Sequence, residues 1–81
     1  MDLLKAIQDY VDELIKHNYY PKRKRPSLGK LEKMADLCMD KKFKKLSRYV
    51  PEDIGNDEKE KFNALMNKIK EIVEDEKKNI K

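Results

Sequence analysis

The sequence predicts an all-α fold, a small bundle of three main amphipathic helices joined by short connections. Three segments repeat apolar residues at the three- and four-residue spacing of a helix. Thr and Trp are absent and Gly occurs only twice, so the chain has few of the residues typical of strands and hairpins. At 81 residues it has room for one domain with one modest core.

The first helix is expected over about residues 2–19. Its apolar stripe consists of Leu3, Leu4, Ile7, Tyr10, Val11, Leu14 and Ile15. Tyr20 precedes Pro21 and is therefore biased away from helical backbone. Residues 20–27 are expected to form a linker, and the four consecutive cations in it repel one another, which favours an extended chain.

The second helix is expected over about residues 28–49, with Ser27 as its N-cap. Its apolar stripe would consist of Leu28, Leu31, Met34, Ala35, Cys38, Met39, Leu46, Tyr49 and Val50. Cations gather on another side of the same helix, at Lys30, Lys33, Lys41, Lys44, Lys45 and Arg48.

Two residues do not fit this pattern. Lys42 falls within the apolar stripe and Leu37 falls on the basic side. A kink or break near Asp40 would remove the conflict and give helices of roughly 28–39 and 42–49. A single helix, distorted at this point, is the favoured interpretation.

The third main helix is expected over about residues 57–78, after a turn at residues 50–56 that Pro51 begins and in which Ile54 points inward. Asn56 or Asp57 is expected to cap it. Its stripe consists of Phe62, Leu65, Met66, Ile69, Ile72 and Val73. The three stripes are thin for the length of the chain, so a homodimer that buries further apolar surface is an open alternative.

The chain has little that could carry catalysis. His17 is the only histidine, and Glu13, four residues earlier, is expected to pair with it on the helix surface. Cys38 is the only cysteine, which excludes an internal disulfide, and its place on the apolar stripe predicts burial. Lys41 and Lys42 lie close enough in sequence to lower the pKa of its thiol if it were exposed. Acidic groups with helix-face spacing lack the histidines of a carboxylate metal site, and they are interpreted as solvated faces. We expect a non-enzyme without metal or cofactor.

The excess positive charge is confined to the middle of the chain. Residues 21–50 contain eleven cations and three carboxylates, a net charge of +8, whereas residues 1–20 and 51–81 each carry −2. Lys and Arg clusters of this kind are typical of surfaces that bind nucleic-acid phosphates. The candidate binding residues are Lys22, Arg23, Lys24, Arg25, Lys41, Lys44, Lys45 and Arg48, with Tyr19 and Tyr20 as candidates for stacking on bases.

The favoured function is that of a small accessory or regulatory protein that binds DNA or RNA phosphates. Two alternatives stay open: an adaptor or inhibitor, of viral or mobile-element type, that docks its basic face on an acidic protein, and a helical subunit of a larger nucleic-acid-handling complex. No apolar run is long enough for a membrane span, and no signal-peptide pattern is present. A cytoplasmic protein is expected, although residues 21–26 resemble a nuclear-import signal that would apply in a eukaryote.

Overall fold

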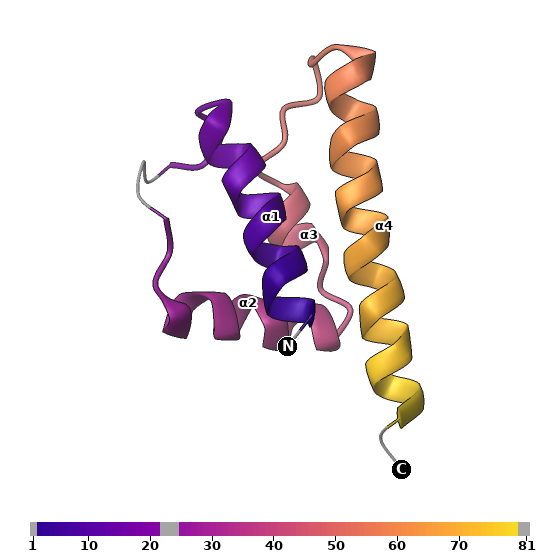
Figure 1. Cartoon of the computed structure of the whole chain (residues 1–81). Coiled ribbons are helices and arrows are strands. Elements are labelled where there is room, and N and C mark those ends of the chain that lie inside the picture. The colour runs from indigo at the N-terminus through magenta and orange to yellow at the C-terminus, as the bar shows by residue number, and fades with distance from the viewer. Residues whose placement is uncertain (1, 22–24, 80–81) are drawn as a thin grey trace.

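The computed structural model describes residues 2–21 and 25–79, and every regular element in these ranges is a helix. The elements are α1 (Asp2–Lys16), α2 (Leu28–Met39), α3 (Lys44–Ser47) and α4 (Asn56–Asn79). α1 packs along α4, and α2 lies across the N-terminal end of α1 and contacts both helices (Figure 1). The predicted all-α bundle with three main helices is confirmed, with α3 as an additional short helix.

The core lies between α1, α2 and α4, where the predicted stripes meet. Leu3, Ile7, Val11 and Leu14 of α1 are fully buried. The stripe of α4 supplies the buried side chains Phe62, Met66, Ile69 and Val73, and α2 supplies Leu31, Ala35 and Cys38. Each large apolar side chain buried in this way contributes about 1.5–3 kcal/mol. The hydrophobic effect therefore accounts for the association of the three main helices.

The second predicted helix is split, unlike the continuous helix that was favoured. α2 ends at Met39 in a Schellman motif. The Lys42 N–H donates to the Leu37 carbonyl at 2.9 Å, and the Lys41 N–H donates to the Cys38 carbonyl at 2.9 Å. Lys41 has a φ of 62°, which turns the chain out of the helical path. The two residues that did not fit one helix are thereby separated, because Lys42 lies outside both α2 and α3.

At the start of α2, one of two predictions is confirmed and the other is wrong. The Ser27 cap is confirmed, since its Oγ accepts a hydrogen bond from the Lys30 N–H at 3.4 Å. Leu28 was expected in the apolar stripe, but its side chain is 64% exposed because it lies in the first turn of α2, beyond the edge of the core. None of the described helices combines the length and the apolar character that crossing a bilayer requires.

Candidate binding surface

α2 and α3 enclose an apolar cleft between them. The chain reverses after α2, so that Leu46 of α3 is buried against the core, 2% exposed, close to the half-buried Met34 and Leu37. The cleft has a volume of about 170 Å³. Its lining consists of Lys30, Lys33, Met34, Leu37, Lys45, Leu46, Arg48 and Tyr49.

Four cations, which we call the cleft cations, surround this apolar floor. They are Lys30, Lys33, Lys45 and Arg48, and all four residues are exposed. α2 also carries Glu32 and Asp36, but none of the described carboxylates lines the cleft. The result is an apolar depression with positive charge on its border.

Helical spacing explains why α2 contributes both lysines and a leucine. Lys30, Lys33 and Leu37 are separated by three and four residues, which places them on one side of a helix. Leu37 is therefore the apolar residue on the basic side that did not fit the predicted stripe. It is half-buried and faces the cleft instead of the main core.

Tyr49 and Arg48 are held in place by contacts with each other and with the core. The Tyr49 ring lies 5.2 Å from the Tyr20 ring, between centroids, and the Arg48 guanidinium lies 5.1 Å from the Tyr49 centroid. Arg48 Nη2 also donates to the Tyr49 hydroxyl at 3.3 Å. Cation–π contact and this hydrogen bond keep the guanidinium at the border of the cleft.

The predicted basic residues are not all brought together. Lys45 and Arg48 border the cleft, while Lys22, Arg23 and Lys24 lie outside the described residues. Lys30 and Lys33 border the cleft but were not among the candidates. The signal that could have selected them was Leu37, an apolar residue on the same side of α2.

The other predicted cations lie apart from the cleft. Arg25 makes a bidentate ion pair with Asp12 of α1, with both N–O distances at 3.0 Å. Lys41 forms an ion pair with Glu74 of α4, with Nζ and Oε1 3.8 Å apart. Lys44 is exposed on α3 and is not among the lining residues.

The two tyrosines proposed for base stacking are engaged inside the protein. Tyr20 is 5% exposed and belongs to the core. The half-buried Tyr19 donates its hydroxyl proton to Glu58 at 2.8 Å and stacks on His17, with ring centroids 5.4 Å apart. Stacking on a base would require Tyr20 to leave the core.

The expected contact between Glu13 of α1 and His17, which follows α1, is present, and it extends to α4. His17 Nε2 lies 2.9 Å from Glu13 Oε2, and His17 Nδ1 lies 3.1 Å from Glu58 Oε1. Each ring nitrogen of His17 thus lies within hydrogen-bonding distance of a carboxylate.

Cys38 is fully buried as expected, and burial raises the pKa of its thiol to about 11, so the thiol is poorly suited to nucleophilic chemistry.

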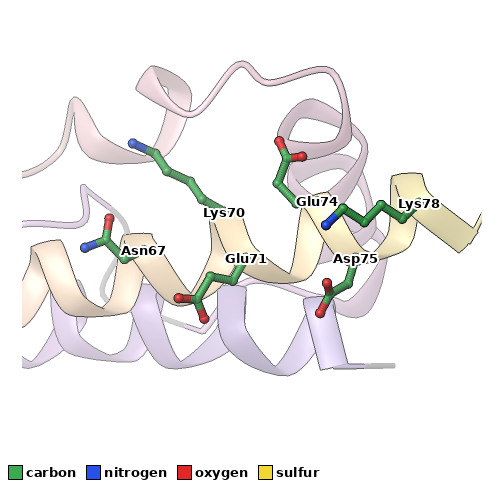
Figure 2. A pocket seen from close by; sticks show the side chains of 6 residues that line it. All are labelled: Asn67, Lys70, Glu71, Glu74, Asp75 and Lys78. Atoms are coloured by element: carbon green, nitrogen blue, oxygen red, sulfur yellow. The ribbon is translucent and has the colours of Figure 1, made fainter.

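A larger depression lies along the exposed side of α4, and all of its lining side chains come from that one helix. In Figure 2, Lys70 and Glu74 point to one side of α4, whereas Glu71 and Asp75 point to the other. Glu74 thus points away from Glu71 and Asp75, and no group of three metal-ligating side chains occurs among the described residues. This depression has the character of a solvated helix face.

Compared with protein-family models, curated proteins and solved structures, the chain matches none.

Proposed function

We propose that this is a non-catalytic binding protein that docks on an anionic macromolecule through the cleft cations. The observation that supports the proposal most strongly is the position of four cations from α2 and from the α3 region around one cleft, with no described carboxylate among the lining residues. Lys33 and Lys45 have no ion-pair partner in the described part of the chain, so their charges are available to a ligand.

Nucleic acid is one candidate partner. Beyond the cleft, exposed Lys41 and Lys42 lie in the connection between α2 and α3, and exposed Lys44 begins α3. Residues 22–25 add four cations in sequence. Closely spaced cations of this kind neutralise successive phosphates and release counterions. An acidic protein surface is the second candidate, and the apolar floor of the cleft favours it, because protein interfaces combine an apolar centre with a polar border.

Fluorescence anisotropy with labelled oligonucleotides and labelled polyglutamate tests the proposal. We expect at least one of these polyanions to bind, with an affinity that falls steeply between about 50 mM and about 200 mM salt. The variant Lys33→Gln/Lys45→Gln should bind more weakly, with a salt slope smaller by about 2 for an oligonucleotide. The matched variant Lys68→Gln/Lys77→Gln, which removes the same charge from α4, should bind nearly like the wild type. Absence of binding to every polyanion at low salt, or equal losses in the two variants, would refute the proposal.

A further inference from the structure

The cleft joins an apolar floor to a positively charged border, and this combination specifies more than an affinity for polyanions. We propose that the partner is an acidic protein segment that inserts one bulky apolar side chain between α2 and α3, while its flanking carboxylates pair with the cleft cations. This inference rests on the proposed function and adds the chemistry of the partner to it.

The size of the cleft fits one side chain. Its volume of about 170 Å³ is close to the roughly 150 Å³ of an apolar cavity that holds a single benzene molecule. It lies below the roughly 300 Å³ at which small-molecule and cofactor sites begin. A phenylalanine, leucine or methionine side chain is therefore an occupant of suitable size.

The lining favours a protein side chain over a nucleobase. Met34, Leu37 and Leu46 offer the polar edge of a base no hydrogen-bonding partner beyond the weakly accepting sulfur of Met34. Sites for single-stranded nucleic acid usually present an aromatic ring on which a base stacks. At this cleft the one aromatic ring, Tyr49, is already in contact with Tyr20 and Arg48.

The border supplies charge on both sides of the apolar floor. Lys30 and Lys33 lie on α2, whereas Lys45 lies on α3 and Arg48 follows it. A helical partner segment places carboxylates three and four residues before and after its apolar anchor on the same face. Such a segment would bring acidic groups to both sides of the cleft at once.

Two labelled peptides of about 16 residues test this inference on the full chain. Both are glutamate-rich and helical; one has a central phenylalanine and the other has alanine at that position. We expect the phenylalanine peptide to bind wild-type protein roughly 10- to 30-fold more tightly, the usual effect of truncating a central anchor. The preference should disappear in the Leu37→Gln variant, whose cleft floor is polar, with its folding checked by circular dichroism.

The outcomes separate this inference from the proposed function. Equal, salt-sensitive binding of both peptides, or stronger binding of a single-stranded oligonucleotide than of either peptide, would overturn the anchored acidic segment and leave the cationic docking surface intact. Binding of no polyanion would overturn both. A preference for phenylalanine that persists in folded Leu37→Gln would place the anchor outside the cleft and would also overturn the inference.

Discussion

Replacing Glu13 by glutamine is predicted to loosen the attachment of α1 to α4. Besides its contact with His17, the Glu13 carboxylate lies 3.2 Å from Lys61 Nζ, and the imidazole continues the network to Glu58. Lys61 and Glu58 belong to α4, so the network joins the end of α1 to the first half of α4. Glu13→Gln keeps the shape of the side chain and removes its charge.

The expected loss in the free energy of unfolding follows from how exposed each contact of Glu13 is. Only 11% of the Glu13 side chain is exposed, and a shielded hydrogen bond to a charged group contributes about 1.5–3 kcal/mol. The Lys61 side chain is 54% exposed, so its ion pair with Glu13 contributes less than about 1 kcal/mol to the stability. Allowing for the exposure of His17 as well, we expect a loss of about 1–2 kcal/mol near neutral pH. For a domain of this size, that corresponds to a fall of roughly 5–15 °C in Tm.

The loss should depend on pH. Burial by itself raises the pKa of Glu13, but its hydrogen bonds with His17 and Lys61 and the positive charges of Lys61 and Lys16 outweigh burial, so the pKa lies below its ordinary value of 4.5. A carboxylate with a lowered pKa in the folded state stabilises the protein above its unfolded-state pKa, and this contribution is lost as the pH falls through the folded-state pKa.

Thermal unfolding followed by circular dichroism at about pH 7 and about pH 3 is the assay, with the exposed Glu60→Gln as a matched control expected within about 0.5 kcal/mol of wild type. The Tm difference between wild type and Glu13→Gln should narrow at the lower pH. An equal Tm difference at both pH values, or no difference near neutrality, would show that the Glu13 carboxylate does not stabilise the contact between α1 and α4.

Three further predictions concern single contacts. Cys38, buried and with a pKa of about 11, should react with a thiol reagent near pH 8 only as fast as the protein unfolds; rapid labelling of the folded protein would contradict this. Asp12→Ala should cost less than about 1 kcal/mol in urea unfolding, because the Arg25–Asp12 pair is exposed; a larger loss would show that this pair anchors the fold. Lys41→Gly should raise the stability by about 0.5–1 kcal/mol in the same assay, since Lys41 has a left-handed φ of 62°; a lower stability would show that the lysine is not strained there.

The helical stripes of α1 and α4 were predictable because each runs over several turns without interruption. The split between α2 and α3 left a signal in the sequence, the misplaced Leu37 and Lys42. A single helix was nevertheless favoured, because the residue with left-handed backbone that ends a helix in a Schellman motif is usually Gly. Here that residue is Lys41, so the sequence carried no glycine signal for a helix end.

The cleft was only partly predictable. Arg48 and Lys45 were selected from the density of charge, but Lys30 and Lys33 meet them only because α3 folds back on α2.

Side-chain contacts between residues far apart in the sequence were not predictable from helical spacing. Arg25 lies 13 residues from its partner on α1, and the contact between Tyr19 and α4 spans 39 residues. Helical periodicity predicts neighbours within one helix and gives no information on partners in another.

Docking of an anionic macromolecule on the cleft cations can be tested by NMR chemical-shift mapping of the full chain during titration with single-stranded DNA and with polyglutamate. We expect the largest shifts around the cleft, on Lys33, Leu37, Lys45 and Arg48, and we expect added salt to reverse them. Shifts concentrated on α4, or an unchanged spectrum with both polyanions at low salt, would contradict it.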